Sequence, residues 1–255
     1  MRVTSGASGR EPRFDRISHS DDIGTAFSAD PANVRWFSAR VVRAAAAVQP
    51  DRLLDIGCGD ASFIAALADV IPGIALVGVD VTAANIAAAR ERMARSPHAA
   101  RLSVVYADYM SLNEGRFPLV TAFGSLQAIG APPGEIASKL RRDLAPGGML
   151  IAVMPKRSLY NRALNTIRRA LVRLRGPFMD QSILVAAKLL HPGRSVSWLH
   201  QRVHCMYHLP RQDGETMRAA LGREGFQVLD EEDAPHPSIG ALQLSITVLV
   251  APAAR

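Results

Sequence analysis

The sequence predicts an α/β fold in which a mostly parallel sheet is covered by helices on both faces. Between residues 52 and 154, short apolar runs alternate with helical patterns, as in successive strand–helix crossovers. A glycine turn, Gly57-Cys58-Gly59, joins the first of these runs to its helix. Of the 255 residues, 48% are hydrophobic, which suits the core of one large domain, or of one domain with an insertion.

The expected elements follow the chain in a regular order. Asp30 and Pro31 are typical of a helix start, and this helix is expected to end at Val48. Thr82 is expected to cap the helix after the second strand, and Asp213 the helix that ends at Arg223. The other expected elements are strands over 52–56, 75–80, 102–106, 119–123 and 149–154, helices over 61–71, 82–95, 133–144 and 213–223, and two final strands over 226–229 and 242–250.

The domain organisation is predicted from where this rhythm starts and stops. Residues 1–28 contain Gly6, Gly9 and Pro12 and predict an N-terminal arm. The core is expected to consist of residues 29–155 and 212–255. Residues 156–211 interrupt the alternation and are expected to form a helical cap that faces the substrate.

The positive charge of the protein is concentrated in this cap. Residues 156–211 contain eleven Lys and Arg residues and a single acid, Asp180, so the net charge of the cap is +10. Because the whole chain has a net charge of +7, the rest of it carries −3. A nucleic acid or an anionic membrane is therefore an open alternative partner, although aromatic residues rarely interleave with the arginines.

A helical stripe in the cap favours a small acceptor beneath it instead. The residues Tyr160, Leu164, Ile167, Leu171 and Leu174 share one helical face. We expect this face to pack inward, with Arg168, Arg169 and Arg173 on the opposite, solvated face.

An ordered series of residues follows the predicted strands. Asp55 stands in the glycine turn motif, Asp80 and Asp108 follow the second and third strands, and Leu144-Ala145-Pro146-Gly147-Gly148 precedes the fifth. From about residue 29 to 252, this series resembles the class I S-adenosylmethionine-dependent methyltransferases. The resemblance implies a Rossmann-like sheet of seven strands with an antiparallel last strand, and S-adenosyl-L-methionine as cofactor.

The glycine turn favours this cofactor over a nicotinamide dinucleotide. A dinucleotide turn has a third glycine where this chain has Ser62. In the family that the chain resembles, the acid at Asp55 helps to hold the ammonium of the methionine moiety. Ala61 stands where the family has its last glycine. Gly57 is expected to lie against the methionine end of the cofactor.

The other cofactor contacts are expected at the ends of the next strands. Asp80 is placed to accept both ribose hydroxyls, and Val81 to form an apolar wall for the adenine. By the resemblance, Asp108 accepts from the adenine amino group, and Tyr109 supplies neighbouring backbone. The full expected set is Asp55, Gly57, Cys58, Gly59, Asp80, Val81, Asp108, Tyr109, Phe123 and Gly124.

Substrate contacts are expected where the fourth strand ends and in the cap. Ser125 and Gln127 follow the fourth strand, and Tyr160 opens the cap. His200 and His204 are candidates for a general base or a substrate contact, with ordinary surface histidines as the alternative. Polar and apolar residues alternate through 199–208, which predicts an extended segment. No metal site is predicted.

The predicted function is transfer of a methyl group to an O, N or C nucleophile of a small molecule, in specialised metabolism. Alternatives are methylation of RNA or a lipid, or a non-catalytic regulator or partner subunit that binds the cofactor. The two cysteines and the absence of a signal-peptide pattern near Met1 favour the cytoplasm. Both a monomer and a homodimer are compatible with the sequence.

Overall fold

The computed structural model describes residues 31–193, 195–234 and 242–253, and within them it confirms the predicted α/β fold. Seven strands form one sheet in the order β3-β2-β1-β4-β5-β7-β6. Strand β7 runs antiparallel to both of its neighbours, and the other pairs are parallel. The strands are β1 (Arg52–Ile56), β2 (Ala75–Asp80), β3 (Leu102–Tyr106), β4 (Phe117–Phe123), β5 (Leu144–Pro155), β6 (Gln227–Asp233) and β7 (Leu244–Val250).

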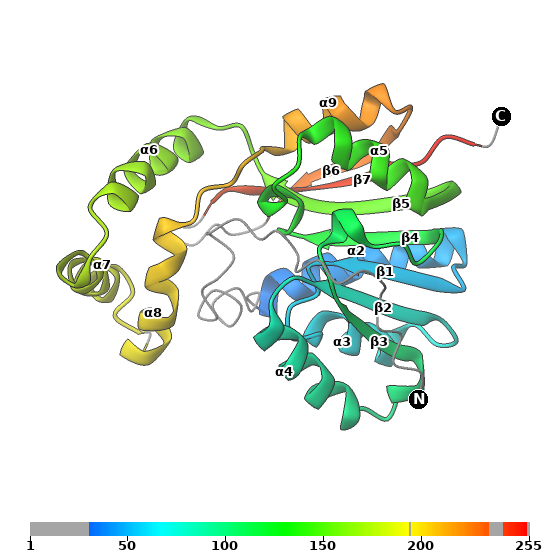
Figure 1. Cartoon of the computed structure of the whole chain (residues 1–255), viewed down its shortest axis with the longest axis horizontal. Helices are drawn as coiled ribbons and strands as arrows, with labels where there is room; N and C mark the ends of the chain where they lie inside the picture. The colour runs from blue at the N-terminus through cyan, green and yellow to red at the C-terminus, as the bar shows by residue number, and fades with distance from the viewer. Residues whose placement is uncertain (1–30, 194, 235–241, 254–255) are drawn as a thin grey trace.

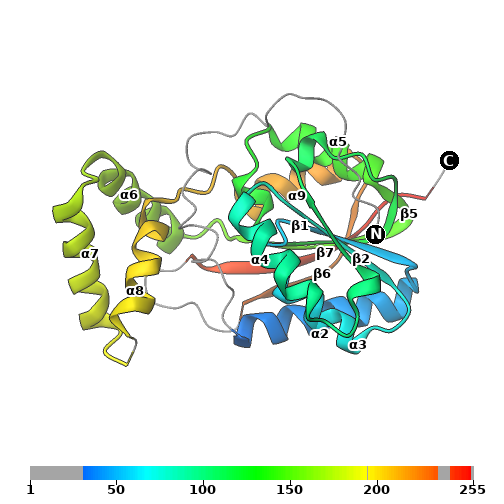
Figure 2. The ribbon, with the colours of Figure 1, turned by 60° about the horizontal axis from the view of Figure 1, so that its bottom comes forward.

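Two layers of helices enclose the sheet (Figures 1 and 2). The helices are α2 (Pro31–Val48), α3 (Ser62–Val70), α4 (Ala83–Ala94), α5 (Pro133–Asp143) and α9 (Gly214–Arg223). One core cluster joins the sheet to α2, α3 and α4, and a second joins it to α5 and α9. Strands with apolar side chains on both faces need this double cover, because either face would otherwise meet water. The expected arm 1–28 and the Asp30 cap lie outside the described residues.

Two strands, β5 and β6, extend at least four residues beyond the apolar pattern at one end. Strand β5 begins at Leu144 instead of residue 149, and Leu144 pairs with Phe117 across a register shift. Strand β6 extends to Asp233 and includes the acids 230–233. These acids are tolerated because β6 is an edge strand whose side chains meet solvent. They pair with bases of the core and the cap, including Arg218 with Glu231 and Lys156 with Asp233.

The cap consists of α6 (Leu159–Arg173), α7 (Pro177–Leu190), α8 (Val196–Val203) and the short helix η4 (His204–Tyr207). In both ribbon views these helices stand beside the sheet instead of on one of its faces (Figures 1 and 2). The extended segment predicted for 199–208 is wrong: α8 and η4 occupy it. The polar–apolar alternation misled because Leu199 and Val203, four residues apart, form the buried face of a helix.

The inward face predicted for α6 is also wrong in part. Of the expected stripe, Leu164 is buried, whereas Tyr160, Ile167 and Leu174 are exposed. The buried line is instead Asn161, Leu164 and Arg168. The polar side chain of Asn161 is tolerated in this line because it is hydrogen-bonded: it donates to the carbonyls of Lys156 and Gln243 and accepts from the amide of Gln243.

Hydrogen bonds close the two ends of the cap on each other. The guanidinium of Arg157 donates to the two carboxylate oxygens of Asp213, at 3.0 and 3.2 Å, and to the hydroxyl of Thr216. Asp213 also caps α9 by accepting from the amide of Thr216 at 2.8 Å, as predicted. The cap therefore leaves the core and returns to it at one place.

Candidate functional site

The candidate site lies where the strand order reverses. From β1 the chain runs outward through β2 and β3, and then returns to place β4 on the other side of β1. The connections that follow β1 and β4 thus leave the carboxyl ends of these neighbouring strands in opposite directions. In open α/β sheets, this is the position at which ligands bind.

The glycine turn is held against β2. The amides of Gly57 and Cys58 both donate to the carbonyl of Val79, at 2.8 and 3.0 Å. The side chain of Cys58 is buried over Gly78, where even a methyl group would lie 2.6 Å from its sulfur. Cys58 therefore faces the sheet, and only its backbone belongs to the candidate ligand surface.

The space beside the α-carbon of Gly57 is filled by Ser125. A side chain at Gly57 would therefore meet Ser125, and not the methionine end of the cofactor that was expected there. A Cβ at Gly57 would lie 2.4 Å from the Cβ of Ser125, and its φ of +73° is a conformation that other residues rarely adopt. The hydroxyl of Ser125 donates to the carbonyl of Ile56. Ser125, predicted as a substrate contact, thus fastens the loop after β4 to the end of β1. Gly59, by contrast, has open space beside its α-carbon.

The backbone angle of Ala61 explains why the family has a glycine at this position. It precedes α3 with a φ of +60°, a left-handed conformation that costs an alanine about 1 kcal/mol. Its methyl group is fully buried, which offsets part of that cost. The sequence shows that a small residue stands here, but it does not show the backbone angle.

Asp55 is a buried carboxyl group in β1. The hydroxyl of Thr121, on the neighbouring strand β4, donates to it at 2.7 Å. Burial raises the pKa of Asp55 to about 7, against the lowering effect of the Thr121 bond and with a smaller contribution from the charge of Asp80. Such a group gains from a nearby cation, because a positive charge favours the ionised carboxylate.

Asp80, at the end of β2, organises the turn around it. One carboxylate oxygen accepts from the amide of Gly59 at 3.0 Å, and the other accepts from Thr82 at 2.8 Å and Asn85 at 3.2 Å. The side chain of Thr82 makes no capping bond, so the expected Thr82 cap is wrong and Asp80 serves the start of α4 instead. Asp80 therefore fixes the glycine turn.

The next three predicted residues, in the loops after β2 and β3, differ in how deeply they are buried. Val81 and Asp108 are half-buried, and the carboxylate of Asp108 accepts from the amide of Met110 at 3.0 Å. The ring of Tyr109 is buried with the ammonium of Lys139 4.8 Å from its centre, which places this side chain against α5. The side chain of Tyr109 is thus occupied by this packing, and its expected backbone contact with the cofactor stays a prediction.

The loop after β4 provides Phe123, Gly124 and Gln127. The ring of Phe123 packs edge-on against Phe37, with centroids 5.0 Å apart, and Gly124 donates to the carbonyl of Val153. The side chain of Gln127 is buried, and its oxygen has no hydrogen-bond partner among the described residues. A buried amide oxygen of this kind gains from any donor that a ligand or water brings.

The predicted cap residues lie less favourably than those of the core. Tyr160 and His200 are exposed, and His204 is in η4, although its side chain is outside the description. The hydrogen bonds to the loop after β4 come instead from residues 208–212. The amide of Arg211 donates to the carbonyl of Gln127 at 2.9 Å, and the buried Gln212 donates to that of Leu126 at 2.6 Å.

His208 lies three residues before Arg211, whose amide contacts this loop. Burial lowers its pKa, and the nearby charges of Arg168 and Arg211 lower it further. Arg168 also donates to the carbonyl of His208 at 3.3 Å. The signal that could have selected His208 over His200 and His204 is its position at the cap's return to the core.

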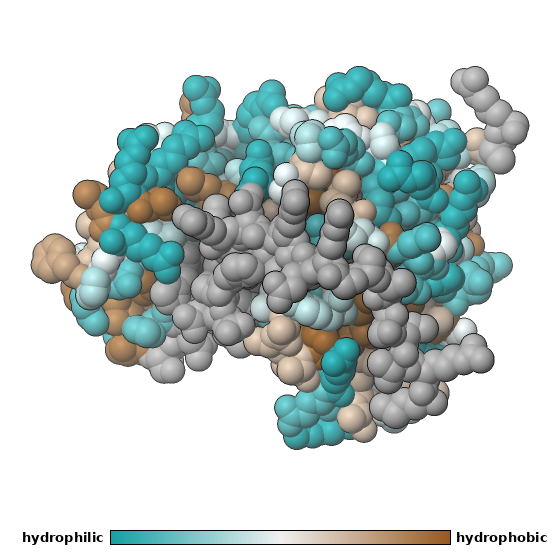
Figure 3. Space-filling view, in the orientation of Figure 1, coloured by the Kyte–Doolittle hydropathy of each residue, from teal (hydrophilic) through white to brown (hydrophobic). Residues whose placement is uncertain are grey.

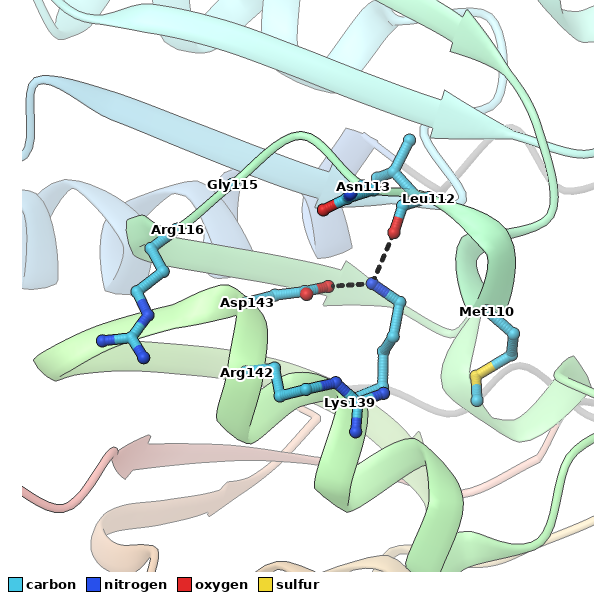
Figure 4. A pocket seen from close by; sticks show the side chains of 8 residues that line it. All are labelled: Met110, Leu112, Asn113, Gly115, Arg116, Lys139, Arg142 and Asp143. Atoms are coloured by element: carbon cyan, nitrogen blue, oxygen red, sulfur yellow. Dashed lines mark hydrogen bonds and ion pairs between the residues drawn. The ribbon is translucent and has the colours of Figure 1, made fainter. Parts of the chain in front are cut away.

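A cavity of about 270 Å³ lies elsewhere, beside the amino ends of β4 and β5 (Figure 4). There Lys139 donates to the carbonyl of Leu112 and to the carboxylate of Asp143, at 2.7 and 2.6 Å. Because its charge is already neutralised by Asp143, we assign Lys139 a structural role. Among the described residues, no cluster of His, Cys, Asp and Glu could hold a metal ion, and no helix is long and apolar enough to cross a membrane.

The sheet order, with acids in β1, at the end of β2 and after β3, is that of a class I S-adenosylmethionine-dependent methyltransferase domain. Comparison with known proteins agrees: residues 54–150 match the family model of a methyltransferase domain. Residues 54–150 therefore have the sequence pattern of a methyltransferase domain.

Curated relatives match the chain in part. It is 32% identical over 134 residues to trans-aconitate 2-methyltransferase of Acidovorax sp. (strain JS42), a match covering 49% of either protein. It is 27% identical over 210 residues to malonyl-[acyl-carrier protein] O-methyltransferase of Geobacter sulfurreducens, covering 78% of this chain and 66% of that protein. The chain thus spans about half to two thirds of the length of these relatives.

A solved structure has the same fold over most of its length. The N-methyltransferase NodS from Bradyrhizobium japonicum WM9, in complex with S-adenosyl-L-homocysteine, superposes with a TM-score of 0.61. The match covers 93% of this chain and all of NodS at 15% sequence identity. At this identity, the likeness concerns the fold.

Proposed function

We propose that this protein transfers the methyl group of S-adenosyl-L-methionine to an O, N or C nucleophile of a small-molecule acceptor. The observation that carries this proposal is Asp55, a buried acid with a raised pKa at the switch point of the sheet. The ammonium of the cofactor's methionine end is the cation that such a group would favour. A pyrophosphate, by contrast, would be repelled.

Two further acids of the chain suit the remaining cofactor groups. Asp80 retains acceptor capacity for ribose hydroxyls beyond the hydrogen bonds that hold the turn. Asp108 follows β3, where the family has an acceptor for the adenine amino group. The open side of Gly59 leaves space for a ligand beside the turn. These residues together fit the cofactor.

The chemistry demands little of the chain beyond alignment. The sulfonium of the cofactor supplies an already electrophilic methyl group. The chain has to hold the acceptor's nucleophile in line with it and exclude water, and orientation then supplies most of the acceleration. Gln127 and the segment 208–212 are the residues we assign to this task, because they border the loop after β4.

The same residues favour an acceptor that carries a carboxylate. The guanidinium groups of Arg168 and Arg211 act electrostatically on His208, so the border of the loop is positively charged. The curated relatives are named for trans-aconitate and malonyl groups, which are carboxylic acids. An ionised carboxylate is itself the nucleophile, so no general base is needed.

Turnover of a panel of acceptors with radiolabelled cofactor tests the proposal. We expect label in small carboxylic acids, and little in their amides or in tRNA. Arg211→Gln should raise KM for the acid acceptor, because a carboxylate loses a cationic partner. The matched change Arg223→Gln, on the exposed end of α9, should leave KM unchanged. Cofactor binding without turnover of any acceptor would favour a regulator, and binding of NAD alone would refute the proposal.

A further inference from the structure

Helix α7 is apolar and yet has no buried residue. Its 14 residues, Pro177–Leu190, include two charged side chains, Asp180 and Lys188. Phe178, Val185 and Leu189 are 83%, 60% and 78% exposed. Their spacing of seven and four residues places them on one face of the helix, so a continuous apolar stripe faces solvent. A monomeric protein rarely leaves such a stripe without a function.

Helix α6 adds a second exposed stripe. Tyr160, Ile167 and Leu174 follow one another at intervals of seven, and Ile167 and Leu174 are 54% and 63% exposed. The face that anchors α6 to the protein, formed by Asn161, Leu164 and Arg168, is a different one. The most amphipathic helix of the described chain therefore turns much of its apolar side outward. Figure 3 shows hydrophobic side chains gathered over the cap at the left of the molecule, with hydrophilic ones between them.

Basic side chains accompany these stripes. Arg162, Arg169 and Arg173 are exposed on the polar side of α6, and no acidic partner contacts them within the described parts of the chain. The single acid of the cap, Asp180, accepts a hydrogen bond from Tyr207. A helix with an apolar face and an Arg-rich polar face is the form that lies in the interface of a membrane.

We propose that α6 and α7 dock the cap on an anionic lipid membrane. The stripes of Phe178, Val185 and Leu189 and of Ile167 and Leu174 would enter the boundary between headgroups and acyl chains, and the arginines would meet the lipid phosphates. Charge decides against a second copy of the chain, because two caps of +10 would repel each other. A polyanion such as RNA would leave the apolar stripes in water.

This docking surface is independent of the proposed methyl transfer. It requires neither the cofactor nor an acceptor, and its residues lie outside the candidate site. Helix α7 is too short to span a bilayer, so the contact would be peripheral and reversible. Vesicle binding measured without cofactor therefore separates a failure of this inference from a failure of the proposed function.

Co-sedimentation of the full chain with vesicles tests the inference. We expect binding to vesicles of phosphatidylcholine mixed with phosphatidylglycerol, little binding to phosphatidylcholine alone, and release at high salt. Serine at Phe178, Val185 and Leu189 should weaken the partition into anionic vesicles at least about tenfold, since each side chain loses its burial in lipid. Val70→Ser, which removes an exposed side chain of α3, should leave the partition unchanged.

A second set of variants isolates the charge. Glutamine at Arg162, Arg169 and Arg173 should also weaken binding at least about tenfold, whereas glutamine at the exposed core residues Arg90, Arg95 and Arg223 should have much less effect. The proposal is overturned if anionic vesicles fail to bind the parent protein at low salt. It is also overturned if both sets of cap variants bind like the parent, or if Phe178 proves to be buried in a dimer that excludes vesicles.

Discussion

The core and the cap of this protein respond differently to the same kind of pattern. In the core, an apolar helix face lies against the sheet: Ile136 and Leu140 of α5 are fully buried. In the cap, an apolar face of equal regularity on α6 is largely exposed, and Arg168 is buried in its place. The difference teaches that periodicity predicts a helix and its two faces, but the neighbouring surface decides which face is covered. A face of the sheet is an apolar surface that accepts any such helix, and the cap helices lie on neither face.

The largest effect expected in the core is at Gly57. Gly57→Ala should destabilise the fold by about 2–5 kcal/mol and abolish measurable cofactor binding, because left-handed strain adds to the contact with Ser125. Gly59→Ala has a similar backbone strain but open space, so it should cost only about 1–2 kcal/mol. Denaturant unfolding of both variants gives the comparison. Equal losses would show that the Ser125 contact is unimportant, and Gly57→Ala combined with Ser125→Gly should recover part of the difference.

One pair of equal substitutions sharpens the comparison on the side of the cap. Leu164→Ala should destabilise the protein by about 2–4 kcal/mol, because it empties a buried position. Leu174→Ala removes the same atoms from an exposed position and should stay within about 0.5 kcal/mol. Thermal or denaturant unfolding, followed by circular dichroism, measures both. The reverse order would mean that the face containing Leu174 is the packed one.

Asp80 combines a structural and a binding role, so its substitution tests the core more finely. Asp80→Ala should weaken S-adenosyl-L-methionine binding by about 1.5–3 kcal/mol, the value of hydrogen bonds to a charged group. Asn85→Ala removes one of the bonds to Asp80 but leaves the carboxylate in place, and should weaken binding less. Calorimetry measures both affinities. Unchanged affinity in Asp80→Ala would remove this residue from the site.

The most gradual effect expected is a pH dependence that comes from Asp55. Its pKa is raised from 3.8 to about 7 in the folded protein. The folded chain therefore holds a proton that the unfolded chain has lost, and the stability of the ligand-free protein should fall as pH rises from about 4 to 7. A cation bound beside Asp55 requires the ionised form, so cofactor affinity should rise with pH up to about 7, by at most about tenfold per pH unit.

Calorimetry in buffers of different ionisation enthalpy measures this proton release directly. Asp55→Asn should abolish it. Asp60→Asn is the matched control in the same turn: although burial opposes it, hydrogen bonds from Ser62 and Arg92 lower the pKa of Asp60, so this group stays ionised throughout. Release of a proton that persists in Asp55→Asn would assign the linkage to another group.

The sequence predicted the sheet, its helices and the acids after three strands because each depends on local residues. Short apolar runs, Asp213 as a cap and the glycine turn act over a few positions. What it did not predict depends on distant partners. The contact of Gly57 with Ser125 joins residues far apart in the chain, and the strand formed by 230–233 depends on β7 beside it. Likewise, the position of His208 near the loop after β4 depends on where the cap returns to the core, and a periodic pattern of residues does not predict this.

The hydrogen bonds between Arg157 and Asp213 have a consequence for exchange of parts between proteins. These hydrogen bonds join the two ends of a long insertion through one side chain, so the cap is a loop whose ends are fixed close together. The entropy of closing such a loop depends only weakly on its length. Residues 159–207 can therefore be shortened, lengthened or transplanted with little strain on the sheet, and a chimera that keeps Arg157 and Asp213 should exchange the exposed helices α6 and α7 while its core folds as before.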